Sequence, residues 1–333
     1  MTALFVVTTL AALLFSCLAR VLGRRLWIVD LPNARSSHDA PTPRTGGIAV
    51  AGGWFLALAA AGHFLPGFDP AVLVLAAATI LFGLGFLDDL LSLTPRTRLA
   101  VQVVTAMTLV VGLAAGQKAL GLPWQVLTVP LAVGAFVWFV NLFNFMDGIN
   151  AIAALQYLFM LGGAVLIHPA LAQDATALAA VLLGAAVLGF LPFNLIGGRL
   201  FLGDGGSYLL GGMLAAIALH TVYLSMMTPW TWAILGCAFI SDATVTLIRR
   251  FLRGKRVTTP HREHAYQVLA RRIDSHLLVS CGVVALNLAW LLPMAWLSHV
   301  WPAHGVWLLV VAATPVVIAV TVLGGSDTNS VKS

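Results

Sequence analysis

The sequence predicts an all-α fold, a polytopic membrane bundle of about eleven transmembrane helices, with ten as the other count that fits. Of the 333 residues, 60% are hydrophobic and 9% are charged, against a charged share of ~25% in soluble domains. The apolar residues also form blocks about 18 residues long, enough to span a bilayer as a helix. A soluble globule is therefore excluded, and the short segments of alternating polarity that form a β-barrel are not seen.

Each block is about long enough to cross a hydrocarbon core of ~30 Å at ~1.5 Å per residue. The first block is followed by arginines and has no basic leader or small-residue cleavage site, so we expect a retained helix. We expect one integral-membrane domain at 1–325 and a short polar C-terminal tail at 326–333. The blocks are 4–21, 47–64, 71–87, 99–115, 124–142, 151–167, 175–195, 207–224, 230–247, 277–297 and 306–322.

The positive charges predict the orientation of the helices. All but one of the 18 lysines and arginines fall on one side of the blocks, and Lys118 alone falls on the other. Because lysine and arginine mark cytoplasmic loops, we expect that side to be cytoplasmic and the N-terminus to be outside. The net charge of +6 then reflects topology and contact with anionic lipid, so a nucleic-acid partner is not needed.

The residues inside the apolar blocks bear on two alternatives to a functional site in the loops. Cys17, Cys237 and Cys281 all lie inside apolar blocks, which offers neither a disulfide framework nor a CxxC metal site. A transporter would usually carry ionisable residues near the midplane, and Asp242 is the acid that lies well inside a block. Asp242 shares a helix face with Arg249, so functional, packing and ion-pair roles all remain open for it.

The loop after the first block combines prolines, basic residues and a glycine pair. Gly46 and Gly47 open the second block, where free backbone N–H groups and the helix dipole favour an anion. Arg35, His38 and Arg44 add hydrogen-bond donors nearby. An ordinary cytoplasmic loop would explain the arginines but explains the glycine pair less well.

Three further cytoplasmic loops carry acids where blocks end. Asp88 and Asp89 end the third block, Asp147 follows the fifth, and Asp204 follows the seventh. A helix C-terminus is partly negative and disfavours carboxylates. A bound cation would relieve this repulsion, and hard oxygen ligands favour Mg²⁺, or Mn²⁺, over zinc. Solvated carboxylates with no ligand are the alternative.

The last of these loops and the largest loop both favour phosphate. Gly205 and Gly206 follow Asp204 and permit an anion-binding backbone concavity, and Ser207 is a plausible N-cap for the eighth helix. In the loop between the ninth and tenth blocks, His261 and His264 share a face if the segment is helical. Their loop supplies too few partners for zinc, so phosphate binding or proton transfer fits better.

These loops resemble one family, the polyprenyl-phosphate N-acetylhexosamine-1-phosphate transferases. The similarity runs through five motifs in order on one face. They are PTPR-x-GG at 41–47, FLDD at 86–89, N-xx-N-xx-DG at 141–148, FLGDGGS at 201–207, and the histidine-bearing loop that ends near Gln267.

The resemblance implies a role for each matching residue. Asp204 would ligate Mg²⁺ on the pyrophosphate of the nucleotide sugar, and Asp88, with Asp89 beside it, would position or deprotonate the lipid phosphate. Asp147 and His264 complete the catalytic set that the family implies. The residues expected to bind substrate are Arg44, Asn144, Asn150, Asn194, Phe201, His261 and Arg262. Of these, Phe201 would pack on uracil.

The implied reaction transfers a sugar 1-phosphate from a UDP-N-acetylhexosamine to undecaprenyl or another polyprenyl phosphate, with release of UMP, in the bacterial inner membrane. His264-Ala-Tyr-Gln267 and the neutral Asn150 are more similar to the branch that starts O-antigen than to the peptidoglycan branch. A phospho-N-acetylmuramoyl-pentapeptide transferase and a polytopic lipid or sugar transporter are the alternatives. The oligomeric state is open, with a homodimer among the options.

Overall fold

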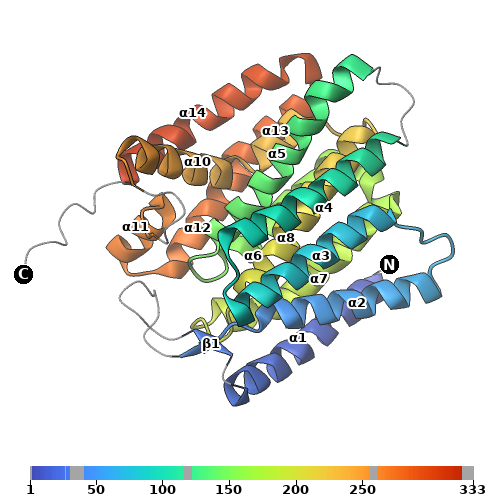
Figure 1. The fold of residues 1–333 in the computed structure, drawn as a ribbon, viewed down its shortest axis with the longest axis vertical. Coiled ribbons are helices and arrows are strands. Elements are labelled where there is room, and N and C mark those ends of the chain that lie inside the picture. The colour runs from blue at the N-terminus through green and yellow to red at the C-terminus, as the bar shows by residue number, and fades with distance from the viewer. Residues whose placement is uncertain (1, 27, 31–40, 116–121, 256–260, 325–333) are drawn as a thin grey trace, which may run out of the picture.

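The structure is a computed structural model of the chain, and it describes residues 2–26, 28–30, 41–115, 122–255 and 261–324. Nearly all regular structure is helical, apart from a two-residue antiparallel pair of β1 (Val29–Asp30) and β2 (Thr42–Pro43). The long helices pack side by side as a bundle, and β1 and α11 lie at one end of it (Figure 1). The helices of the first half are α1 (Thr2–Arg25), α2 (Gly46–Phe64), α3 (Val72–Leu91), α4 (Pro95–Ala115), α5 (Leu122–Met146), α6 (Ile152–Ile167) and α7 (Ala175–Leu195), with the short η1 (Pro169–Gln173) before α7.

The second half contains three long helical segments and a bent helix pair. The helices are α8 (Gly203–Tyr223), α9 (Pro229–Leu235), α10 (Cys237–Leu252), α11 (Ala265–Ile273), α12 (His276–Leu286), α13 (Leu292–Val300) and α14 (Gly305–Leu323). A π-helical turn, η2 (Asn287–Leu291), joins α12 to α13, and η3 (Pro302–His304) precedes α14.

Burial divides the helices into an inner and an outer group. Most of α7 and α8 is buried inside the bundle, whereas only about a fifth of α1, α12–α13 and α14 is buried although these helices are strongly apolar. Exposed apolar helix surface is what contact with lipid tails requires. The predicted helical membrane bundle is therefore confirmed, with α8 at its centre.

The count of spans is lower than the eleven blocks suggest. In the described residues nine helices are long and apolar enough to cross a membrane, or up to ten if the α9–α10 pair is one broken span. The block at 151–167 forms α6, whose 16 residues rise only ~24 Å. The block at 230–247 bends by 78° between α9 and α10. Its bend lies at Gly236, and the side chain of Gln156 donates a hydrogen bond to the carbonyl of Leu235 there, 3.1 Å away.

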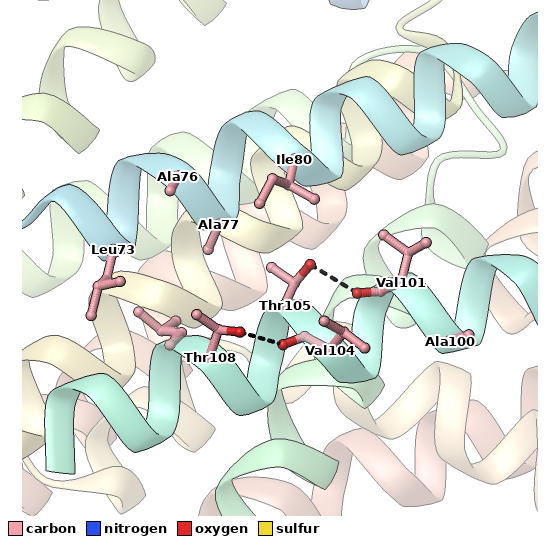
Figure 2. A pocket seen from close by; sticks show the side chains of 10 residues that line it. Leu73, Ala76, Ala77, Ile80, Ala100, Val101, Val104, Thr105 and Thr108 are labelled. Atoms are coloured by element: carbon pink, nitrogen blue, oxygen red, sulfur yellow. Dashed lines mark hydrogen bonds between the residues drawn. The ribbon is translucent and has the colours of Figure 1, made fainter. Parts of the chain in front are cut away.

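A lipid-side groove of about 330 Å³ separates parts of α3 and α4 (Figure 2). Small and branched apolar side chains such as Ala77, Ile80 and Val104 line it. The hydroxyl of Thr105 donates to the carbonyl of Val101 in its own helix, 2.8 Å away, so its polarity is satisfied internally. The groove carries no charged residue and lies apart from the polar loops.

Candidate active site

The acids of the FLDD and FLGDGGS motifs meet where the end of α3 packs on the start of α8. A Cβ atom added at Gly85 would lie 2.2 Å from the carbonyl oxygen of Asp204, so only glycine permits this approach of the two backbones. The backbone N–H of Gly205 donates to Oδ2 of Asp89, 3.0 Å away. Two sequence motifs more than a hundred residues apart thus form one acidic cluster.

Asp88 and Asp89 have different surroundings although they are adjacent. Asp88 is 6% exposed, and its oxygens accept hydrogen bonds from the N–H of Leu93 at 2.8 Å and from the guanidinium of Arg98 at 2.7 Å. In contrast, Oδ1 of Asp89 is buried and has no hydrogen-bond partner among the described residues. Asp88 is therefore held by an ion pair, and Asp89 offers an unused carboxylate oxygen.

Asp204 lies in the first turn of α8, and Asn144 at the end of α5 holds it. The amide of Asn144 donates to Oδ1 of Asp204 at 2.7 Å and to the hydroxyl of Ser207 at 3.1 Å. The expectation that Asp204 sits at a disfavoured helix C-terminus is wrong, because α7 ends at Leu195 and a helix N-terminus favours a carboxylate. Ser207 is also not the N-cap, since α8 begins at Gly203.

Asp147 follows the last residue of α5 and completes the acidic cluster. Burial raises the pKa of Asp147 well above its usual range, and the negative charges of Asp204 and Asp89 raise it further. The repulsion predicted from the sequence therefore exists in the folded protein. A group that lowers the negative potential here would stabilise the ionised carboxylates.

The donor set fits Mg²⁺ that is bound partly by substrate phosphate. Within the described residues no three His, Cys, Asp or Glu side chains converge closely enough to hold a metal ion by themselves. Mg²⁺ usually keeps several waters and takes one or two carboxylates together with substrate phosphates. The buried, unpartnered Oδ1 of Asp89 beside Asp204 matches that pattern.

The expectation that Gly46 and Gly47 form an anion site is wrong. Their N–H groups donate to the carbonyls of Phe201 at 2.9 Å and Leu202 at 2.7 Å. A Cβ atom at Gly47 would lie 2.4 Å from the backbone nitrogen of Gly206. The glycine pair therefore allows α2 to pack on the start of α8. In this contact the N–H groups that were expected to bind an anion bind peptide carbonyls.

Arg44 remains near the acidic cluster. Its guanidinium pairs with Asp30, and its side chain is 41% exposed. A Cβ atom at Gly203, which has a φ of +73°, would lie 2.6 Å from the carbonyl of Arg44 and 2.8 Å from Oδ2 of Asp89. Arg44 thus borders the site through its backbone and keeps a partly exposed cation beside it.

The residues expected to contact the nucleotide have two kinds of surroundings. Asn194 is 5% exposed. Its amide oxygen accepts a hydrogen bond from the N–H of Ala151 at 2.5 Å, and its amide nitrogen donates to the carbonyl of Leu200 at 2.9 Å. Its hydrogen-bonding groups therefore tie the start of α6 to the loop between α7 and α8. Asn150 lies across that loop, with its amide about 3 Å from where a Cβ of Gly198 would be, and Phe201 is partly buried at the start of α8.

The histidine loop folds differently from the single helical face that the sequence suggests. His264 precedes the first residue of α11 and is 3% exposed, so His261 lies outside the helix. The two rings nevertheless stack, with centroids 4.9 Å apart. Burial, together with the charges of His264 and Arg250, lowers the pKa of His261 to about 4. Arg262 lies beside it and accepts a hydrogen bond at its carbonyl from Arg271, 3.0 Å away.

The structure joins this loop to the acidic cluster through Tyr266. Its hydroxyl donates to the carbonyl of Phe145, 2.9 Å away. A Cβ atom at Gly148 would lie 2.3 Å from the same hydroxyl oxygen. The histidine loop is thus docked on the Asp147 segment.

Sequence reasoning missed Arg98 and Tyr266, and it assigned Asp242 no definite partner. Arg98 lies ten residues after Asp88, and the short α3–α4 connection could have suggested that they meet. Asp242 does not pair with Arg249, because Arg249 binds backbone carbonyls at the end of α14, including that of Gly324 at 2.5 Å.

Comparison with known proteins identifies the family. A family model described as glycosyl transferase family 4 matches residues 71–222. A decaprenyl-phosphate N-acetylglucosaminephosphotransferase of Mycobacterium leprae (strain TN) is 30% identical, over 78% of this chain and 74% of its own. The chain belongs to the polyprenyl-phosphate N-acetylhexosamine-1-phosphate transferases.

Two more distant relatives of this transferase family come from other bacteria. Both are named undecaprenyl-phosphate alpha-N-acetylglucosaminyl 1-phosphate transferase. The protein of Thermotoga maritima is 27% identical over 76% of each chain, and that of Salmonella typhi is 27% identical over 80% of this chain and 75% of its own. In this transferase, the acids at 88, 89, 147 and 204 all lie within the matched segment 71–222, and the histidine loop lies after it.

Proposed function

We propose that this protein transfers N-acetylhexosamine 1-phosphate from a UDP-sugar to polyprenyl phosphate and releases UMP. The observation that carries the proposal is the cluster of Asp88, Asp89, Asp147 and Asp204 at one end of an apolar bundle, with an unpartnered oxygen on Asp89. A membrane-embedded acceptor accounts for a phosphoryl-transfer site built on membrane helices. The names of the relatives support N-acetylglucosamine as the sugar and a decaprenyl or undecaprenyl acceptor.

In the proposed step, an oxygen of the lipid phosphate attacks the phosphorus that carries the sugar. A new P–O bond forms, and the bond from that phosphorus to the bridging oxygen breaks, so that UMP leaves with this oxygen. Asp89 and Asp147 would help to orient the lipid phosphate, and Asp204, held by Asn144, would be the Mg²⁺ ligand. When bound, Mg²⁺ would neutralise and align the pyrophosphate.

The basic groups around the cluster would offset the charge that develops during transfer. Arg44 and His264 are the groups we assign to this role, and Arg262 and His261 would contact the donor phosphates. Asp88 is paired with Arg98, so we assign it the placement of neighbouring groups and of the acceptor. One phosphoanhydride replaces another, and the reaction is therefore expected to lie near equilibrium without ATP.

The cellular setting follows from the same proposal. The site would face the cytoplasm of the bacterial inner membrane, where UDP-sugars are found, and the N-terminus would lie outside. The product would start O-antigen or another cell-envelope polysaccharide.

The decisive assay is UMP release by the purified protein in detergent. The reaction contains undecaprenyl or decaprenyl phosphate, Mg²⁺ and one UDP-N-acetylhexosamine at a time. Asp204→Asn should abolish release, whereas Asp69→Asn, an exposed acid in the α2–α3 loop, should not. The proposal would be refuted if none of the UDP-sugars led to UMP release, or if Asp204→Asn released as much UMP as the wild type. UMP should also drive the lipid product back to UDP-sugar, which a transporter would not do.

A further inference from the structure

A buried aspartate in α10 has a set of contacts that the proposed reaction does not use. Asp242 is 4% exposed, and its two oxygens accept hydrogen bonds from the N–H groups of Ala265 and Tyr266, each 3.0 Å away. The hydroxyl of Thr246 also donates to Oδ1, at 3.1 Å. Asp242 thus supplies from another helix the carboxylate that caps the N-terminus of α11.

This contact is chemically specific. The first N–H groups of a helix have no partner within it, and a carboxylate placed there satisfies them and is favoured by the helix dipole. The N-cap residue of α11, His264, makes no capping hydrogen bond with its own side chain. The bend after α9 redirects α10. Asp242 thereby reaches the start of α11, which lies 23 residues later in the sequence.

Asp242 also fixes the ring of His264. Nδ1 of His264 lies 3.2 Å from Oδ1 of Asp242. An ionised carboxylate only accepts hydrogen bonds, so Nδ1 carries the proton and Nε2 is the ring nitrogen left for another group. His264 stacks on Tyr266, with ring centroids 5.8 Å apart, and Tyr266 bonds to the Asp147 segment through the carbonyl of Phe145.

We propose that Asp242 is a positioning residue that sets the tautomer and place of His264 and anchors α11 on the Asp147 segment. The inference rests on the proposed transferase function for its kinetic consequence. Its structural consequence, the anchoring of α11, is independent of the reaction. An amide at this position has one acceptor oxygen and would turn an N–H group toward the donors of α11.

The kinetic test compares Asp242→Asn with a matched variant, Asp174→Asn. Asp174 likewise caps a helix, accepting from the N–H of Ala177 at 2.7 Å, and pairs with a histidine, His220, at 3.4 Å. It lies at the end of α7 opposite the site. Asp242→Asn should lower the kcat of UMP release by about 10²-fold or more, with the donor KM within about threefold. Asp174→Asn should retain kcat, and equal losses would overturn the proposal.

A double variant separates positioning from general support of the fold. If Asp242 acts through His264, then adding Asp242→Asn to His264→Ala should cause little further loss of kcat. Losses that multiply would overturn the proposal. If Asp242→Asn does not fold, Tyr266→Phe removes the hydroxyl contacts to the Phe145 and Gly148 backbone and to Gln267, and should lower kcat about tenfold. Wild-type kcat in Tyr266→Phe would then overturn it.

Limited trypsin digestion tests the anchor without the reaction. Arg271 and Arg272 are exposed on α11, and cleavage there requires the helix to open. Asp242→Asn should speed this cleavage, and Asp174→Asn should not. Unchanged cleavage in a folded Asp242→Asn protein would overturn the anchoring role. Absence of UMP release by the wild type would instead refute the proposed function and leave the digestion result as the test of Asp242.

Discussion

Replacing Gly85 by alanine should damage both the stability and the activity of the protein. The added Cβ would lie 2.2 Å from the carbonyl oxygen of Asp204 and 2.7 Å from the nitrogen of Gly205. The nearest contact is about 1.2 Å shorter than the 3.4 Å at which ordinary contact begins. Both neighbours are backbone atoms, so α3 and α8 must separate by about that amount. Such overpacking typically costs about 1–3 kcal/mol.

The same displacement would move Asp89 away from Asp204. A misplacement of about 1 Å at a reacting centre can cost about 10²-fold in rate, so we expect a loss of that order in the kcat of UMP release. Gly83→Ala is the matched control, because its Cβ would meet nothing within 4 Å on the same helix. Thermal unfolding in detergent and the UMP assay check both effects. Wild-type behaviour of Gly85→Ala, or equal damage by Gly83→Ala, would refute this reasoning.

Three other predictions concern the charges around the site. Arg98→Ala would leave the buried Asp88 without its ion-pair partner, so it should lower the free energy of unfolding by about 1–3 kcal/mol and reduce the melting temperature and the activity. The control, Arg96→Ala at an exposed position, should change neither. Equal melting curves for the two variants would contradict this prediction. EDTA should abolish UMP release and added Mg²⁺ should restore it, and full activity in EDTA would exclude the metal. Between pH 6.5 and about 4 the unfolded chain binds a proton that folded His261 does not, so stability falls as the pH falls through this range. His261→Gln should reduce that fall in melting temperature, and an unchanged slope would count against the lowered pKa.

The membrane bundle was predictable because its signal is local. A run of about 18 apolar residues favours a membrane helix through its own composition. The motifs likewise predicted that the acids at 88, 89, 147 and 204 form one site, because all of them fall at block ends on the same side of the membrane. The structure brings them into one cluster, with Asn144 holding Asp204.

The count of eleven spans is too high, and the count of ten fits, because one helix depends on more than hydropathy. The apolar run at 230–247 is long enough for a straight helix, but it bends at Gly236, where Gln156 from α6 binds a backbone carbonyl. That partner is 79 residues away in the sequence. A window of hydropathy contains no information about it.

The sequence by itself determined the class of fold and the family, and it singled out the acids that gather at one end of the bundle. Only the tertiary structure decided which atoms those residues use. It gave the N–H groups of Gly46 and Gly47 to peptide carbonyls and paired Asp242 with His264 in place of Arg249. The physical reason is that hydrophobic patterning acts along the chain, whereas hydrogen-bond partners depend on how the helices rotate and bend against each other.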